Sequence, residues 1–493
     1  MMMKRSAGVL LHPTSLPGPY GIGDLGPSAY EWVDFLAKAG FSWWQTLPVG
    51  PTGYGHSPYQ SYSSFAGNFM LISLDRLVEM DLLTKQEIEP PIAFPEDYVD
   101  FAKVLPYKLR LITLAASRFV DRAAQSDAYQ SFCKRNSAWL PDYALFISLK
   151  KKFGEVAWVD WPQKYRDRDL QIIAKIKQER AVDIESQSIV QFFFDQQWKD
   201  LREYASAKGI GMIGDIPIYV AHDSVDVWIN RGLFQLDADG QLTALAGVPP
   251  DYFTETGQLW GNPLYRWEIH AQDDFAWWRE RLAHSLQAFD YVRLDHFRGF
   301  AGYWSVPAGE ETAKNGQWIP GPGHAFFEAM QRGIAPLAIL AEDLGEITPD
   351  VIELRNDFDL PSMKILQFAF FDGLDHDFLP HNYPENAVVY TGTHDHDTSR
   401  GWFESAEPQE QAFALHYLKA TPETVIDNMV EAALKSVARL AAFPLQDLLD
   451  LGTEARMNEP GTLEGNWLWR MRAENMNQDL QERMKRLNSV CNR

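Results

Sequence analysis

Short apolar runs recur along the chain, and most of them are followed by a longer segment with helical periodicity. Such alternation is typical of parallel strands joined by helical crossovers. The runs predict eight strands, at residues 7–11, 41–47, 211–216, 291–294, 337–341, 363–368, 387–391 and 437–443. Eight strands favour an α/β fold of the closed (β/α)8 type, a TIM barrel, although the pattern alone is also compatible with a doubly wound open sheet.

The spacing between the predicted strands is uneven. A long, mostly helical and polar interval separates the second strand from the third, and an interval rich in Gly, Pro and aromatic residues separates the third from the fourth. Insertions of this kind usually lie on the loop side of a barrel. We expect one catalytic barrel over residues 1–493, with a helical insertion at 70–200 and a loop-rich insertion at 222–288, both over the C-terminal rim.

The charge balance is strongly acidic, with a formal net charge of −22 over 493 residues. Nucleic acids and anionic membrane surfaces need a basic face, so neither is an expected partner. The two cysteines, Cys133 and Cys491, suggest no disulfide framework, which fits a reducing compartment. Without a visible signal peptide or an apolar stretch of membrane length, the expected location is cytoplasmic.

Four of the predicted strands end in a carboxylate, and these are the candidate catalytic groups. The four acids are Asp215, Asp295, Glu342 and Asp395. Each one alone is more typical of a helix N-cap or of a solvated loop charge. Strand C-termini share one rim of a barrel, however, so the four together are expected to converge on one pocket.

The neighbours of two of these acids suggest different roles. Arg293 lies two residues before Asp295, so both side chains point to the same face of a strand, and the cation is expected to keep the carboxylate ionised. Glu342 follows an apolar run, and burial there would raise its pKa as a general acid requires. Paired carboxylates with unlike protonation suit the cleavage of glycosidic bonds.

A set of motifs makes a family resemblance specific. The chain resembles the 4-α-glucanotransferases known as amylomaltases or disproportionating enzymes, glycoside hydrolase family 77 of the α-amylase clan. The matching segments, in chain order, are residues 8–17, 20–26, 57–61, 65–68, 214–220, 247–253, 257–263, 293–299, 341–345, 391–395, 446–447, 456–458 and 465–467. They run from the first predicted strand to near the chain end, so the resemblance covers nearly the whole sequence.

The resemblance implies a role for each matching residue. It assigns Asp295 as nucleophile, Glu342 as acid/base and Asp395 as the carboxylate that grips sugar hydroxyls. Asp215 and Arg293 would support the nucleophile, Tyr59 would stack on the sugar, and Trp260 and Asp251 would belong to a loop over the acceptor side. The expected substrate-binding residues are Tyr59, Asp215, Asp251, Trp260, Arg293, His394, Ser57 and Asn466.

The implied reaction moves α-1,4-glucan segments between maltooligosaccharides by a retaining double displacement. Maltooligosaccharides and glucans derived from starch or glycogen are the expected substrates. A hydrolase similar to α-amylases is the alternative within this chemistry, and an inactive glucan-binding protein is the alternative outside it. No organic cofactor or catalytic metal is implied, although His394-Asp-His-Asp397 leaves a zinc site open if further ligands lie nearby.

Two positions depart from the family pattern. Phe69 stands where the family commonly has Pro, which is expected to matter little. The family also usually has Thr-His-Asp-Asn-Asp-Thr, whereas here His396 stands in the place of the Asn within residues 393–398. Asp395 is retained, so the resemblance still implies catalysis. The change is expected to alter hydrogen bonding beside Asp395.

Overall fold

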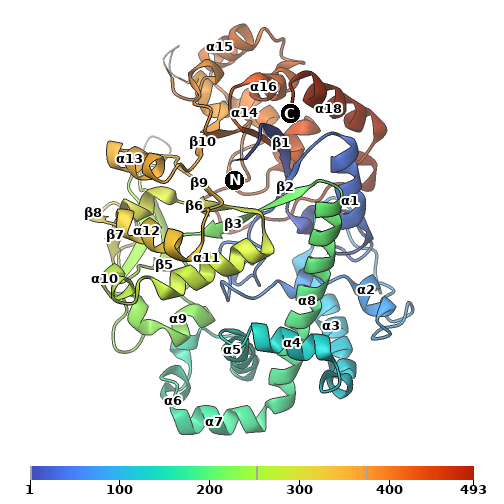
Figure 1. The fold of residues 1–493 in the computed structure, drawn as a ribbon, viewed down its shortest axis with the longest axis vertical. Coiled ribbons are helices and arrows are strands. Elements are labelled where there is room, and N and C mark those ends of the chain that lie inside the picture. The colour runs from blue at the N-terminus through green and yellow to red at the C-terminus, as the bar shows by residue number, and fades with distance from the viewer. Residues whose placement is uncertain (1–2, 251–253, 372–375) are drawn as a thin grey trace.

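The computed structural model describes residues 3–250, 254–371 and 376–493 (Figure 1). An eight-stranded parallel sheet lies at its centre, in the order β10-β11-β12-β1-β2-β3-β6-β9. The strands are β1 Ser6–Leu10, β2 Trp43–Gln45, β3 Gly211–Pro217, β6 Tyr291–Asp295, β9 Ile339–Ala341, β10 Ser362–Ile365, β11 Ala387–Tyr390 and β12 Leu440–Pro444. Each of the eight overlaps a strand that the sequence predicts.

The two ends of this sheet approach each other, which makes it a nearly closed barrel. The amide of Ala341 in β9 donates to the carbonyl of Pro361, which directly precedes β10, at 3.1 Å. Alternate residues of the strands point inward and pack against one another; the buried ones are Ile213, Leu340, Met363, Ile365, Val388, Tyr390, Leu440 and Ala442. The interior is therefore a packed core, as in other barrels of this type, and the predicted (β/α)8 fold is confirmed.

Helices cover the outside of the sheet. Helix α1 (Pro27–Lys38) begins with Pro at its first position and buries Trp32, Val33, Phe35 and Leu36 on one face. The further helices that surround the sheet are α11 Ala276–Ala288, α12 Gly323–Gly333, α13 Pro349–Asp357, α14 Ser399–Ser405, α15 Pro408–Leu418, α16 Val425–Lys435, α17 Leu445–Leu448 and α18 Gln478–Val490. In the described residues, the helices are all too short or too polar to cross a membrane.

The interval between β2 and β3 is helical. It contains α2 Leu74–Glu79, α3 Phe101–Ala123, α4 Asp127–Arg135, α5 Leu140–Lys152, α6 Gln163–Arg166, α7 Leu170–Glu179 and α8 Ala181–Ala207. Helices α4 to α7 gather at the bottom of Figure 1, and the long α8 runs from them to the barrel. The Trp198 indole on α8 donates to the carbonyl of Ala288 at the end of α11, at 3.1 Å, so this region is attached to the barrel wall.

A second sheet lies between β3 and β9 in the sequence, and two of its strands fall within residues 222–288, where the sequence predicts a loop-rich insertion. Its four antiparallel strands, in the order β5-β4-β7-β8, are β4 Ala244–Val248, β5 Gln258–Pro263, β7 Gly302–Pro307 and β8 Gln317–Pro320. The short helices α9 Val225–Ile229 and α10 Trp267–His270 flank the first two strands. The sheet pairs Ala244 with Pro307, far along the chain, and a local sequence pattern does not reveal such a contact. The division at 70–200 and 222–288 stays a prediction.

Candidate active site

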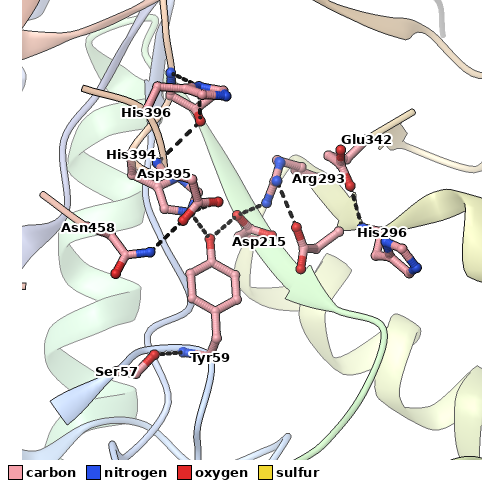
Figure 2. A network of polar contacts seen from close by, with 12 residues as sticks. Ser57, Tyr59, Asp215, Arg293, His296, Glu342, His394, Asp395, His396 and Asn458 are labelled. Carbon is pink, nitrogen blue, oxygen red and sulfur yellow. Dashed lines mark hydrogen bonds and ion pairs between the residues drawn. The ribbon is translucent and has the colours of Figure 1, made fainter. Parts of the chain in front are cut away.

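The four predicted acids lie at the carboxyl ends of barrel strands. Asp215 is in β3, Asp295 is the last residue of β6, Glu342 directly follows β9, and Asp395 lies in the loop after β11. Neighbouring strands pair Leu294 with Ala341, so Asp295 and Glu342 follow paired positions, whereas Asp215 pairs with Arg293 and lies two residues deeper in the sheet. Figure 2 shows Asp215, Glu342 and Asp395 arranged around Arg293.

Arg293 joins two of the carboxylates. One guanidinium nitrogen lies 2.7 Å from Asp215 Oδ2, and the other lies 2.7 Å from Asp295 Oδ1. The Arg293 side chain is 4% exposed and that of Asp215 is fully buried, whereas Asp295 remains 25% exposed. A buried cation with two anionic partners fixes the orientation of both, and the Asp295 carboxylate still faces solvent where a substrate can reach it.

The ion pair expected from the sequence is present, but its electrostatic effect on Asp295 is outweighed. Burial raises the pKa of the Asp295 carboxyl above its ordinary value and the nearby Asp395 charge adds to the rise, although Arg293 opposes both. Burial also raises the pKa of Asp215, to about 6. Arg293 therefore favours the ionised form of Asp295, as the sequence suggests, while the loss of solvation inside the barrel works in the opposite direction.

Glu342 is held by two backbone amides. The amide of His296 donates to Glu342 Oε2 at 2.6 Å, and the amide of Leu344 donates to Glu342 Oε1 at 3.1 Å. His296 adopts a left-handed backbone conformation, with φ of 52°, in the turn that directly follows Asp295. Burial raises the pKa of Glu342 well above its ordinary value, with Asp295 adding to the rise, so this carboxyl is suited to carry a proton.

Asp395 has the opposite character. The Asn458 amide donates to Asp395 Oδ1 at 2.7 Å, and His394 Nε2 lies 3.2 Å from Asp395 Oδ2. Burial by itself would raise the pKa of this carboxyl, but His394, Arg293 and Asn458 together hold it below the ordinary value. The side chain is 37% exposed, so Asp395 presents a permanent negative charge to the open site.

Tyr59 connects the two sides of this network. Its hydroxyl donates to Asp215 Oδ2 at 2.9 Å and lies 2.7 Å from His394 Nε2. Since the hydroxyl hydrogen goes to Asp215, His394 Nε2 is the donor in the second contact. The Tyr59 and His394 rings stack with their centroids 5.3 Å apart and 8° between their planes. The two rings form a fixed wall beside Asp215 and Asp395.

The remaining predicted sugar contacts differ in how near they lie to the carboxylates. Trp260, on β5, sets its ring edge-on to His296 at 4.8 Å between centroids, which puts it beside the Glu342 donors. Ser57 accepts from the Tyr59 amide at 3.2 Å and so supports the stacking ring. Asn466 accepts from the Glu459 amide and donates to Thr462, which holds a turn and makes no bond to the carboxylates. Asp251 lies outside the described residues.

The sequence does not predict the contacts that two groups make in this site. Asn458 lies within one of the matching motifs, but nothing in the spacing of the chain connects it with Asp395. His296 follows Asp295 directly, yet it contributes through its backbone amide, which a residue pattern does not reveal. Among the described residues, no three His, Cys, Asp or Glu side chains are grouped as a metal site would require.

The comparisons with known proteins agree on one family. A family model described as 4-alpha-glucanotransferase matches residues 11–476. A 4-alpha-glucanotransferase of Thermus thermophilus is 47% identical over 96% of this chain and 95% of its own length. The chloroplastic/amyloplastic 4-alpha-glucanotransferase of Solanum tuberosum is 43% identical over 99% of this chain and 86% of its own length.

A solved structure agrees as well. The amylomaltase from Streptococcus agalactiae, solved in complex with acarbose, is 38% identical and superposes with a TM-score of 0.97 over 99% of this chain and 100% of its own. The likeness therefore extends over the barrel, the helical interval and the second sheet together. On the family match and on relatives of more than 40% identity along nearly the whole chain, this protein belongs to the 4-alpha-glucanotransferase family.

Proposed function

We propose that the chain transfers α-1,4-glucan segments between maltooligosaccharides, with Asp295 as nucleophile, Glu342 as acid/base and Asp395 as the charge that stabilises the transition state. One observation carries the assignment of roles: three carboxyls around a single guanidinium have unlike surroundings. Glu342 is buried and holds a proton readily, whereas Asp395 is kept ionised and Asp295 is oriented by Arg293. A retaining glycosidic reaction needs this division of labour.

In the first step, Asp295 attacks the anomeric carbon of the donor while Glu342 protonates the departing 4-oxygen. The bond from the anomeric carbon to that oxygen breaks, and a bond to the Asp295 carboxylate forms. Positive charge develops on the sugar ring as this happens. The ionised Asp395 lies on the same rim and would stabilise that charge, which requires its low pKa.

In the second step, Glu342 acts as a base. It takes the proton from the 4-hydroxyl of an acceptor glucan, and the acceptor oxygen displaces Asp295 from the anomeric carbon with net retention. The backbone amides of His296 and Leu344 stabilise the ionised form of Glu342 that this step needs. The same group thereby serves both steps.

We assign the sugar contacts to the residues around these carboxyls. Tyr59 and His394 offer a flat stacked surface and hydroxyl-binding atoms on one side, and Trp260 stands on the side of Glu342. Asp215 and Arg293 act by orienting the nucleophile, and Ser57 acts by supporting Tyr59. Asp251 and Asn466 remain predicted substrate contacts.

The substrate class and the location follow from further observations. Acarbose is bound in the amylomaltase from Streptococcus agalactiae, and a related oligosaccharide of maltose units is the ligand that we propose here. A net charge of −22 suits a neutral sugar better than a nucleic acid. Both cysteines are free thiols, which favours a cytoplasmic location.

Incubation with maltotriose alone tests the proposal. Transfer yields glucose together with maltooligosaccharides longer than the substrate, resolved by chromatography. Products that are all shorter than maltotriose would contradict it and would support the α-amylase-like hydrolase instead.

Substitution of the nucleophile is the matched control for that assay. Asp295→Asn should reduce product formation by about 10³-fold or more, since it removes the attacking charge. Glu431→Gln, which breaks an exposed pair with Lys435, should leave activity unchanged.

A further inference from the structure

A four-residue turn presents the third carboxylate. The amide of His396 donates to the carbonyl of Thr393 at 3.2 Å, which closes a β-turn with His394 and Asp395 at its two central positions. Both central side chains belong to the proposed sugar-binding surface. The orientation of Asp395 therefore depends on what holds the two ends of this turn.

The His396 side chain makes a second closure of the turn. The Thr393 amide lies 3.1 Å from His396 Nδ1 and donates to it, so this ring nitrogen carries a lone pair. The Thr393 hydroxyl oxygen lies 2.9 Å from the same nitrogen and accepts from the Asp395 amide at 3.3 Å. Its own hydrogen is therefore directed to Nδ1. A continuous hydrogen-bonded chain runs from His396 through Thr393 to the backbone of Asp395.

The surroundings of the ring keep this nitrogen available as an acceptor. Burial lowers the pKa of His396 to about 4, so the imidazole is neutral at physiological pH. The ring packs edge-on against Phe368, with 4.9 Å between the centroids. Figure 2 shows the ring at the top of the network, above Asp395, with Arg293 and Glu342 lower and to the right.

We propose that His396 is a positioning residue, which aligns Asp395 for catalysis through the acceptor Nδ1 and the Thr393 hydroxyl. The inference rests on the proposed function, because it concerns the carboxylate that stabilises the transition state. It also accounts for the departure from the family pattern. Asn Oδ1 is bonded to Cγ as His Nδ1 is, so either residue can place an acceptor at this point.

Two substitutions separate the acceptor from the ring. His396→Asn keeps an acceptor and removes the ring, whereas His396→Phe keeps a ring and removes the acceptor. If His396 acts by positioning Asp395, the Asn variant should retain kcat for maltotriose within about threefold, and the Phe variant should lose about tenfold or more with little change in KM. A role in packing alone predicts the reverse order, because Asn would leave a cavity beside Phe368.

Thr393 supplies an independent test, which also serves if His396→Phe does not fold. Thr393→Val removes the hydroxyl and should lower kcat about as much as His396→Phe, whereas Thr393→Ser should restore it. Since both act through one chain of bonds, the double variant Thr393→Val/His396→Phe should lose little more than either single variant. Additive losses would overturn the inference, and so would a Phe variant with kcat near that of the wild-type chain.

The wild-type chain in the same assay separates this inference from the proposed function. If it only hydrolyses maltotriose, transfer is refuted, and the order of the variants in glucose release still decides the role of His396. A wild-type chain with neither activity would overturn both proposals.

Discussion

Residues of one chemical type perform different tasks in this site because their surroundings differ. Glu342 and Asp395 are both carboxyls on the same rim. Burial and the nearby Asp295 raise the pKa of Glu342 well above the ordinary value, although Arg293 and the backbone amide of His296 oppose the rise. Asp395 receives an Asn side chain, a neighbouring His and the field of Arg293, and its pKa falls. Protonation is decided by partners, not by residue type.

The raised pKa of Glu342 makes a prediction about stability. The folded state favours the protonated carboxyl, so its contribution to the free energy of unfolding is full below the unfolded pKa and is lost as pH rises through the folded pKa. Glu342→Gln mimics the protonated form. Its Tm relative to the wild-type chain should therefore increase as the pH is raised from about 5 to about 8, by several degrees for a change of a few kcal/mol. Thermal melts across this range measure the difference, and a constant difference would contradict the prediction.

At the residue scale, the sequence was sufficient to group those site residues that lie at the ends of predicted strands. The four acids end predicted strands, and parallel strands bring their ends to one rim, so Asp215, Asp295, Glu342 and Asp395 could be grouped without a structure. Asn458 could not be grouped with them, since it reaches Asp395 across 63 residues from an irregular segment. The effect of burial on the pKa of Asp295 could not be predicted, because the depth of burial is not visible in a sequence.

At the scale of elements, the local sequence pattern predicts the barrel strands but not the strands of the second sheet. The barrel strands are buried on both faces, so they form continuous apolar runs that can be recognised one at a time. Strands β4, β5, β7 and β8 each contain Gly or Pro, and the sheet depends on the pairing of β4 with β7, which lies far along the chain. The sequence predicted a loop-rich insertion over residues 222–288, where β4 and β5 lie, although β5 carries Trp260 to the edge of the site.

The position of Trp260 on β5 makes a prediction about the balance of products. Its ring lies against His296, beside the amide that binds Glu342, on the side where we expect the acceptor. Trp260→Ala should admit water and weaken acceptor binding, raising the share of hydrolysis over transfer several-fold. The ratio of reducing ends to long products from maltotriose measures this share. Trp260→Phe, which keeps an aromatic face, should stay close to the wild-type chain; equal ratios in all three would refute the role.

At the scale of the whole molecule, buried polar contacts join the helical interval to the barrel. Lys108 of α3 is fully buried and lies 3.1 Å from Asp24, which belongs to the loop after β1, and it also donates to the carbonyl of Met70. Within the interval, Gln191 and Gln197 of α8 accept from the backbone amides of Gly67 and Ser73, which attaches α8 to the segment that follows β2. We therefore expect the helical interval and the barrel to unfold together.

Lys108→Ala tests this attachment. It leaves the Asp24 carboxyl buried without its cation, and should lower the free energy of unfolding by about 3–5 kcal/mol. Lys103→Ala, on the same helix but at an exposed pair with Asp100, should cost about 1 kcal/mol or less. Denaturant unfolding measures both. Two separate transitions in the wild-type chain, or equal losses in the two variants, would contradict the prediction.

The two hydrogen bonds to Glu342 affect which mutations this site can tolerate. Both of its hydrogen-bond donors are main-chain amides, of His296 and Leu344, and a peptide N–H is supplied by every residue except proline. Substitution of His296 or Leu344 by a residue other than proline can weaken packing, but it leaves the backbone N–H in place. The two hydrogen bonds to Glu342 therefore survive most substitutions at positions 296 and 344, whereas the hydrogen bond from Asn458 to Asp395 depends on one side chain.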